Sequence, residues 1–362
     1  MKIFVINPGS TSTKLALYED DKPVWKHTLA HSVDDLSHFG HVNEQLDYRT
    51  KMIYEAIADA GIDKKFDAVI ARGGLLRPTP GGVYLIDDKI KDDLLNSPNE
   101  HACNLGALMA DILGSDCHCP AFIADPEVVD ERIPESAYTG MPEVPRASIF
   151  HALNGRAVSR QYASSIGRSY EDLNLIVVHL GGGISVSAHC HGRVIDTNDA
   201  LNGDGPFSPE RTGAMPAIRL AELCYSGKYT LAEMKKKIVG KGGLAAYLGT
   251  SDVALIAEKA SRGEQPFAKV LDAMVFSVAK EVGARQVSMR GKVDAIILTG
   301  GIAHSTFVVD KIKYWIDFIA PVIVRAGEDE LGSLAFNAYG ALSGRFPIQT
   351  YDPDSVASPV CK

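Results

Sequence analysis

The chain has 362 residues, of which 46% are hydrophobic and 23% are charged, and its formal net charge is −8. These values are typical of a soluble globular protein that buries a core without disulfides, so disordered, collagenous and coiled-coil classes are excluded. The acidic balance argues against a nucleic-acid partner, which usually meets a basic surface. Apolar runs stay shorter than the ~18 residues of a membrane span and cysteines are few, so the sequence predicts a cytoplasmic protein with no membrane partner.

Alternating strand and helix patterns in the first half of the chain predict an α/β fold. Continuous apolar runs and alternating patterns predict strands over residues 2–6, 12–18, 22–29, 66–71 and 121–124. Helical periodicity predicts helices over 44–60 and 102–113. Gly61 and Gly114 follow these two patterns, and glycine commonly ends helices.

The same order of patterns restarts in the second half. Setting Gly9 on Gly181, an offset of 172, aligns two strand–turn–strand units, and V-D-A-I-I-L-T-G-G at 293–301 matches F-D-A-V-I-A-R-G-G at 66–74 at an offset of 227. Two matches in the same order indicate a duplicated domain, with about 55 extra residues in the second copy. The alternative is two unrelated α/β domains that both place glycine after strands.

The expected domains are an N-terminal one over residues 1–150, a C-terminal one over 151–345 and a tail over 346–362. A final helix over 334–345 could cross back onto the first domain. Residues 196–216 are rich in Gly, Pro, Asn and Asp and are too long for a simple connection, so they predict a functional loop. A core helix is expected over 267–282.

Three turns marked by glycine follow predicted buried strands: N-P-G-S-T-S-T-K at 7–14, H-L-G-G-G at 179–183 and T-G-G-I at 299–302. Such turns expose backbone N–H groups to an anion, and Lys14 adds a positive charge to the first. The first turn is not a Walker A loop, because no glycine precedes the lysine and a strand follows. Each turn alone is also compatible with an ordinary corner of the chain.

With four further motifs these turns resemble the acetate kinase family, and within it the butyrate kinase branch, in the superfamily of sugar kinases, heat-shock chaperone ATPases and actin. The resemblance covers roughly residues 2–345. The further motifs are A-R-G-G-L-L-R-P (71–78), F-H-A-L-N (150–154), P-E-R-T-G (209–213) and G-T-S-D (249–252).

The resemblance implies two duplicated ribonuclease-H-like domains, of the actin-like ATPase type, around a central cleft. It implies reversible phosphoryl transfer from ATP, with Mg²⁺, to a short-chain carboxylate, giving an acyl phosphate and ADP, with butyrate as the expected acceptor. Such a carboxylate is already ionised at neutral pH, since its pKa is near ~4–5, so no general base is required. Positive charge and hydrogen-bond donors are required instead.

The resemblance also assigns site residues. The catalytic candidates are Arg211, His151, Asp125 and Arg72, with Arg77 as an alternative to Arg72 for binding the carboxylate. The nucleotide- and phosphate-binding candidates are Asn7, Ser10, Ser12, Lys14, His179, Gly181, Gly182, Gly183, Gly300 and Gly301. The magnesium candidates are Asn7, Asp125 and Glu328, with Glu330 as a competitor because the spacing there slips.

Three departures from the family pattern are visible: Gly155 stands where a second histidine occurs, Arg72 replaces a histidine, and no basic residue matches the family's arginine upstream of it. Tyr247 and Leu248 are expected to wall the nucleotide. Other possible acceptors are a branched-chain acid such as isobutyrate, or acetate, and a non-catalytic nucleotide-binding protein of the same superfamily is a third hypothesis. By analogy with the family, we expect a homo-oligomer.

Overall fold

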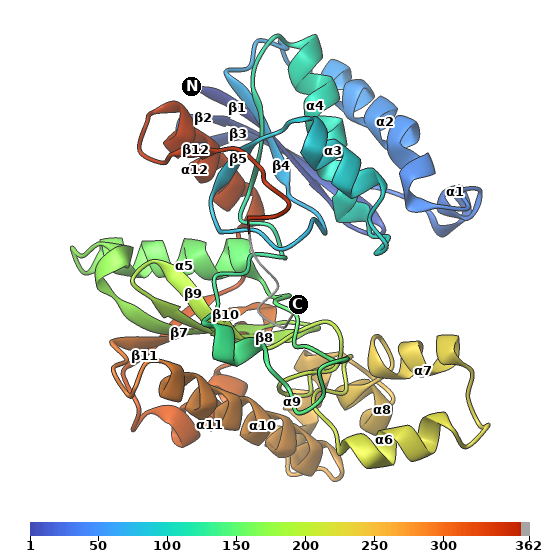
Figure 1. Ribbon diagram of the computed structural model, residues 1–362, viewed down its shortest axis with the longest axis vertical. Coiled ribbons are helices and arrows are strands. Elements are labelled where there is room, and N and C mark those ends of the chain that lie inside the picture. The colour runs from blue at the N-terminus through green and yellow to red at the C-terminus, as the bar shows by residue number, and fades with distance from the viewer. Residues whose placement is uncertain (356–362) are drawn as a thin grey trace. The chain divides into compact units, whose positions relative to one another are not determined.

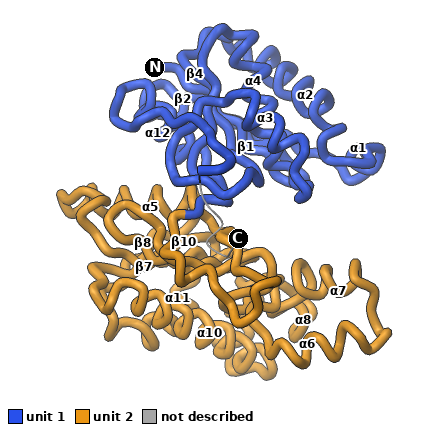
Figure 2. Tube along the Cα trace, viewed as in Figure 1, with its two compact units in different colours: residues 1–130, 329–357 blue, residues 131–328, 358–362 orange. Residues whose placement is uncertain are grey.

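A single β-sheet forms the framework of each of two units in the computed structural model, which describes residues 1–355 (Figure 1). Unit 1 contains residues 1–130 and the described residues from 329 onward, and unit 2 contains residues 131–328 (Figure 2). Of the expected tail over residues 346–362, the part 356–362 lies outside the described residues.

The unit boundaries differ from the expected ones at 150 and 345. The backbone N–H of Ile133 donates to the carbonyl of Ile195, and that of Ala200 donates to the carbonyl of Ile149, so the segment 131–150 is tied to unit 2. The last helix, α12 (Glu330–Leu342), packs on strands of unit 1 through a buried apolar stripe. Tertiary packing at both ends of the second half therefore decides the boundaries.

The sheet of unit 1 has the strand order β12-β5-β6-β4-β1-β2-β3. Its strands are β1 (Lys2–Pro8), β2 (Ser12–Glu19), β3 (Lys22–Ala30), β4 (Ala68–Arg72), β5 (Val83–Leu85), β6 (Ala121–Ala124) and β12 (Ile348–Gln349). β1, β4 and β6 run parallel as neighbours, whereas β2 and β3 continue the sheet in antiparallel order. The carboxyl ends of three parallel strands therefore lie at one edge.

Helices cover both faces of this sheet. They are α1 (Val33–Ser37), α2 (Leu46–Asp59), α3 (Asp88–Leu95), α4 (Leu105–Asp116) and α12, with 3-10 turns η1 (Val42–Gln45) and η2 (Ala102–Asn104). Phe4 and Ile6 of β1 pack in one core with α2 and α4, and since side chains alternate along a strand, α12 covers the other face. The helix predicted to stop at Gly114 continues to Asp116. Gly114 instead allows close contact with the carbonyl of Cys119.

The sheet of unit 2 has the strand order β11-β10-β7-β8-β9. Its strands are β7 (Asn174–Leu180), β8 (Ile184–Cys190), β9 (Arg193–Thr197), β10 (Ala295–Gly300) and β11 (Val322–Ala326). β7, β10 and β11 are parallel, and β8 and β9 are antiparallel. Read from β9 to β11, this order and these directions match β3-β2-β1-β4-β6 of unit 1, as the duplicated sequence pattern predicted.

The helices of unit 2 include an insertion between β9 and β10. They are α5 (Ala152–Ser165), α6 (Ala217–Cys224), α7 (Leu231–Ile238), α8 (Gly243–Leu248), α9 (Val253–Ser261), α10 (Phe267–Ser288) and α11 (Thr306–Ile316), with 3-10 turns η3 (Pro134–Ala137), η4 (Tyr170–Asp172) and η5 (Gly301–His304). α10 runs past the predicted end at 282 and packs on β7, β8 and β9, whereas α5 packs on β7 and β10. The predicted loop 196–216 contains no helix.

None of the helices in the described part of the chain combines the length and the apolar character needed to cross a bilayer.

Candidate active site

Three of the predicted site residues lie at the carboxyl edge of the unit 1 sheet. Asn7 is near the end of β1, Arg72 ends β4, and Asp125 follows β6. These strands are direct neighbours, so the fold brings the three positions to one edge. In α/β sheets this edge is where ligands usually bind.

An acidic pair surrounds Arg72 at this edge. Its Nη1 lies 3.3 Å from Glu330 Oε1, its Nε donates to Glu127, and Asn7 Nδ2 donates to Glu330 Oε2 at 2.6 Å. Burial alone would lower the pKa of Arg72, but Glu127 and Glu330 raise it above its ordinary value. Arg72 is therefore a permanent cation whose charge is already balanced by two carboxylates.

Asp125 is held by backbone contacts with the loop before β5. Its side chain is buried, its Oδ1 accepts from the Gly82 N–H at 2.9 Å, and its own N–H donates to the Gly82 carbonyl. Its φ of 40° lies in the left-handed region, which aspartate tolerates better than most residues. Strained backbone of this kind often occurs at functional sites.

The two acidic candidates near 328–330 have different surroundings. Glu330, which opens α12, contacts Asn7 and Arg72, whereas Glu328 belongs to unit 2 with its Oε2 3.6 Å from His179 Nε2. Arg77, the alternative to Arg72, donates to both oxygens of Asp93. Glu330 is thus the acidic residue that accompanies Asn7.

The oxygen atoms at the unit 1 edge fit a hard divalent cation. Glu127 Oε2 is buried and accepts no hydrogen bond from any described residue, and the carboxylates of Asp125 and Glu330 lie at the same edge. Within residues 1–355, no three acidic, histidine or cysteine side chains are grouped as a preformed metal site. Mg²⁺ commonly takes one or two carboxylates and completes its shell with water and phosphate oxygens, so this set suits it.

The turn 7–14 of unit 1 presents polar groups to solvent. Ser10 and Lys14 are exposed and Ser12 is half-buried. Lys14 stands opposite Asn7 in the β1–β2 register, and the Gly9 N–H closes the turn on the Ser12 carbonyl at 2.7 Å. These predicted phosphate-binding groups are therefore near neighbours of Asn7.

In unit 2 the long loop brings Arg211 against the glycine turn after β7. Ser208 Oγ donates to the Gly182 carbonyl at 2.6 Å and accepts from the Arg211 N–H at 3.1 Å, and Arg211 Nη1 donates to the Ala200 carbonyl. An added Cβ at Gly183 would collide with Arg211 Nη1. Glycine at 183 therefore provides the space in which the guanidinium lies.

Burial lowers the pKa of Arg211 from its ordinary value, and the carboxylates of Glu210 and Asp199 act in the opposite direction. Arg211 forms no ion pair with any residue from 1 to 355, and its side chain is held by a backbone carbonyl. Its charge thus remains available to an anionic ligand.

Two histidines stack in the same unit. The rings of His151 and His179 have centroids 3.6 Å apart and planes 6° apart. His151 Nδ1 lies 2.9 Å from Ser185 Oγ, and His179 Nδ1 accepts from Asn154 Nδ2 at 2.9 Å. Both rings are therefore fixed in orientation.

Asn154 also donates to Thr299 Oγ1 of β10, at 3.2 Å, so it links the histidine at the end of β7 to the neighbouring strand. Sequence reasoning missed the roles of Asn154, Ser185 and Glu127. Asn154 stands inside a recognised motif, whereas Ser185 and Glu127 carried no distinguishing signal.

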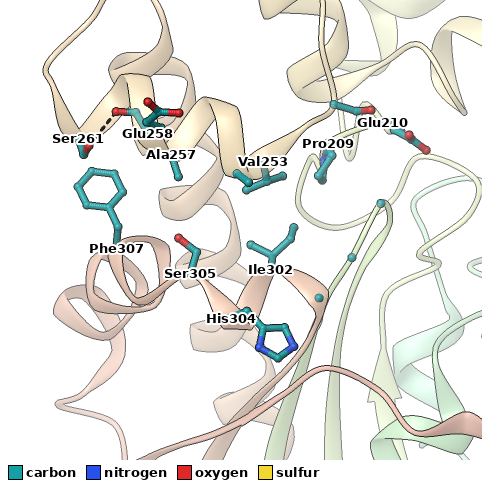
Figure 3. A pocket seen from close by; sticks show the side chains of 15 residues that line it. Pro209, Glu210, Val253, Ala257, Glu258, Ser261, Ile302, His304, Ser305 and Phe307 are labelled. Carbon is teal, nitrogen blue, oxygen red and sulfur yellow. Dashed lines mark hydrogen bonds between the residues drawn. The ribbon is translucent and has the colours of Figure 1, made fainter.

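A pocket of about 680 Å³ opens beside the glycine turn (Figure 3). Figure 3 shows side chains of α9 on one side and those of Ile302, Ser305 and Phe307 on the other. Its lining residues are Gly181, Gly182, Pro209, Glu210, Ser251, Val253, Ala254, Ala257, Glu258, Ser261, Gly301, Ile302, His304, Ser305 and Phe307. Apolar walls with a few polar groups at this size are usual for a small-molecule pocket.

The predicted glycines fall into different roles around this pocket. Gly181, Gly182 and Gly301 line it, whereas Gly300 has a φ of 86° and an added Cβ there would lie 2.5 Å from the Leu180 carbonyl. Gly300 therefore permits close packing of β10 on β7. Tyr247 and Leu248, expected to wall the nucleotide, are not among the residues that line this pocket. Residues of α9 form the wall of the pocket instead.

The two sheets and their shared strand order give the chain the α/β fold seen in actin-like proteins. A family model described as the acetokinase family matches residues 137–318. A protein of Phocaeicola vulgatus named probable butyrate kinase is 65% identical over 354 residues, covering 98% of this chain and 100% of its own. Butyrate kinase 1 of Clostridium acetobutylicum is 45% identical over 97% of this chain and 99% of its own.

Among solved structures, the acetate kinase of Porphyromonas gingivalis has a TM-score of 0.78 at 18% identity, covering 94% of this chain and 99% of that chain. The likeness in structure confirms the predicted fold. The sequence matches show that this chain belongs to the acetokinase family.

Proposed function

We propose that the protein transfers the γ-phosphoryl group of ATP to the carboxylate of butyrate, giving butyryl phosphate and ADP, in a reversible reaction. A carboxylate oxygen attacks the γ-phosphorus in line, and the bond from that phosphorus to the bridging oxygen of ADP breaks. Two anions must meet, so stabilisation of negative charge is the main demand on the protein. The names and the identity of the relatives support butyrate as the acceptor.

The observation that carries the proposal is the placement of Arg211. Its guanidinium lies against Gly183 of the turn whose other glycines line the pocket, and no carboxylate of residues 1–355 pairs with it. In the proposed reaction Arg211 stabilises the charge on the transferring group. His151, oriented by Ser185, donates a hydrogen bond to the same group.

The pocket of unit 2 is proposed to hold the nucleoside of ATP. Val253, Ala257 and Ile302 give the base an apolar surface, and Gly181 and Gly182 let the phosphates approach the main chain. His179, beneath the turn, keeps its position through Asn154.

In unit 1 the turn 7–14 is proposed to bind phosphate through Ser10, Ser12 and Lys14. Asn7, Asp125 and Glu330 are proposed as the residues that hold Mg²⁺, with Glu330 in place of Glu328. When bound, the cation would neutralise phosphate charge. Arg72, bound by Glu127 and Glu330, is proposed to orient the Glu330 carboxylate.

The reaction is tested by trapping acyl phosphate with hydroxylamine in mixtures of protein, ATP, Mg²⁺ and acetate, propionate, butyrate, isobutyrate or valerate. We expect the highest kcat/KM with butyrate. A maximum with isobutyrate or acetate would replace the acceptor but keep the reaction. Absence of acyl phosphate with every acid would refute the proposal and favour a non-catalytic nucleotide-binding protein.

We also propose that the protein is cytoplasmic and forms a homo-oligomer, dimeric or larger. Light scattering measures the mass of the assembly.

A further inference from the structure

A fully buried arginine lies beneath the turn 7–14 of unit 1. Arg49, on α2, has no exposed surface and forms no ion pair with any described residue. Its hydrogen-bond acceptors are neutral: Gln45 Oε1 at 3.0 Å, the Gly9 carbonyl at 2.9 Å, the Ser10 carbonyl at 3.0 Å and Thr13 Oγ1 at 3.2 Å. A buried charge without a counter-charge is costly, so its presence calls for a compensating role.

The hydrogen bonds from Arg49 set the direction of the turn's peptide groups. In a trans peptide the carbonyl and the following N–H point to opposite sides. Because the Gly9 and Ser10 carbonyls point to the guanidinium, the N–H groups of Ser10 and Thr11 point away from it. Both residues are exposed, and neither N–H donates to another described residue. The turn thus offers two adjacent main-chain donors to an anion.

Among the described residues, Arg49 is the charged side chain that binds the turn's carbonyls from beneath. Thr13 Oγ1, which accepts from Arg49 Nη1, also lies 2.8 Å from His31 Nε2. Burial, and then the charge of Arg49, lower the pKa of His31 to about 4, so this histidine is neutral at pH 7. If Arg49 only connected α2 to the turn, neutral hydrogen-bond donors would be enough and a positive charge would not be needed.

We infer that Arg49 is a positioning residue for polyphosphate: it fixes the turn with the Ser10 and Thr11 N–H groups outward, and its charge makes the turn attractive to phosphate oxygens. The inference rests on the proposed function, because the ligand is taken to be the phosphate chain of ATP. It adds a charge from beneath the turn to that of Lys14 at the surface.

The test compares Arg49→Gln, which keeps neutral donors, with Arg49→Lys, which keeps the charge. Lys51→Gln is the matched control, because Lys51 is on the same helix, is exposed and forms an ion pair with Glu55. Calorimetry measures the affinity of each variant for ATP, inorganic tripolyphosphate and adenosine, and thermal unfolding measures stability.

For Arg49→Gln we expect a loss of about 10- to 100-fold in affinity for ATP and tripolyphosphate, the size of a lost charged hydrogen-bond set, with adenosine affinity unchanged. Arg49→Lys should recover at least part of this loss, and Lys51→Gln should match the wild type. Wild-type tripolyphosphate affinity in Arg49→Gln would overturn the inference, as would an equal loss for adenosine or a wild-type protein that does not bind tripolyphosphate.

If Arg49→Gln does not fold, the affinities of Arg49→Lys test the inference instead. Equal losses of affinity for tripolyphosphate and for adenosine in Arg49→Lys would show that Arg49 has only a structural role. Failure of the proposed function is distinct, since it appears as absence of acyl phosphate in the wild type, whereas the binding measurements judge Arg49 without turnover.

Discussion

The carboxyl edges of the two sheets share a scaffold but differ in the side chains at matching positions. Asn7 and His179 are equivalent at the offset of 172, and Arg72 and Thr299 are equivalent at the offset of 227. In unit 1 these positions contact the carboxylate of Glu330, whereas in unit 2 they are linked by the neutral Asn154 amide. Duplication thus preserved the strand order while side chains at matching positions diverged.

The divergence suggests a division of labour. Unit 1 has the acidic residues Asp125 and Glu330 beside its phosphate-binding turn, which suits a cation bound to phosphate, and unit 2 presents Arg211 and two oriented histidines, which suit an anion. Unit 2 alone has the additional loop that carries Arg211. We therefore expect substitutions in the two units to change the kinetics in different ways.

The largest effect is expected in unit 2. Arg211→Ala should lower kcat by about 10²- to 10³-fold, because one group that stabilises transition-state charge is commonly worth that much. ATP affinity should change far less. Steady-state kinetics with butyrate provide the measurement, and Arg219→Ala is the control, since that arginine is exposed and pairs with Glu222. If Arg211→Ala and the control had equal kcat values, the proposed role of Arg211 in the reaction would be wrong.

In unit 1, Glu330→Gln should raise the Mg²⁺ concentration for half-maximal activity by about 10- to 100-fold, the usual range for groups around a metal. Glu328→Gln is the matched control and should shift it much less, because Glu328 contacts His179 rather than Asn7. Magnesium titrations of activity measure both variants. A larger shift in Glu328→Gln would restore the assignment made from sequence spacing.

The buried histidines give each unit a pH response. Burial, followed by the charges of Arg156 and Arg160, lowers the pKa of His189 in unit 2 to about 3. The unfolded histidine, with a pKa near ~6.5, binds a proton that the folded one does not, so the free energy of unfolding falls as pH drops below 6.5. His189 alone should account for about 2 kcal/mol between pH 7 and pH 5.

Urea unfolding of His189→Gln at both pH values checks this sign. The variant should lose less stability on acidification than the wild type does. His31→Gln makes the comparison for unit 1, since the folded pKa of His31 is also lowered, to about 4. An unchanged pH dependence in His189→Gln would show that this histidine is not neutral in the fold.

A smaller effect is expected at the glycine turn. Gly183→Ala should lower kcat about tenfold by displacing the Arg211 guanidinium, because small errors in placement are costly in catalysis. Gly283→Ala is the control, since an added Cβ at this position of α10 would have no atom within 4 Å. Kinetics of the two variants side by side measure the difference. Similar activities would mean that the guanidinium tolerates a side chain at 183.

Much of the fold follows from local patterns in the sequence. β1, β4, β7 and β10 are continuous apolar runs that end in glycine or a polar residue, and their repetition predicted the duplicated sheets. The glycine turns and Arg211 stood in motifs. These features are encoded by neighbours along the chain, which is why they could be predicted.

The remaining features depend on contacts between distant segments. Glu330 reaches Asn7 only because α12 returns to unit 1, and Arg49 meets the turn 7–14 from α2. Glu127 is distinguished by its contact with Arg72, which no local pattern indicates. The unit boundaries were displaced for the same reason.

The most direct test of the central claim uses a mimic of the transferring phosphoryl group. ADP, aluminium fluoride, Mg²⁺ and butyrate should form a tight inhibitory complex with the wild type, and Arg211→Ala should weaken that complex by about 100-fold or more while ADP affinity stays nearly the same. If Arg211→Ala bound the mimic as tightly as the wild type, unit 2 would not supply the charge that stabilises phosphoryl transfer.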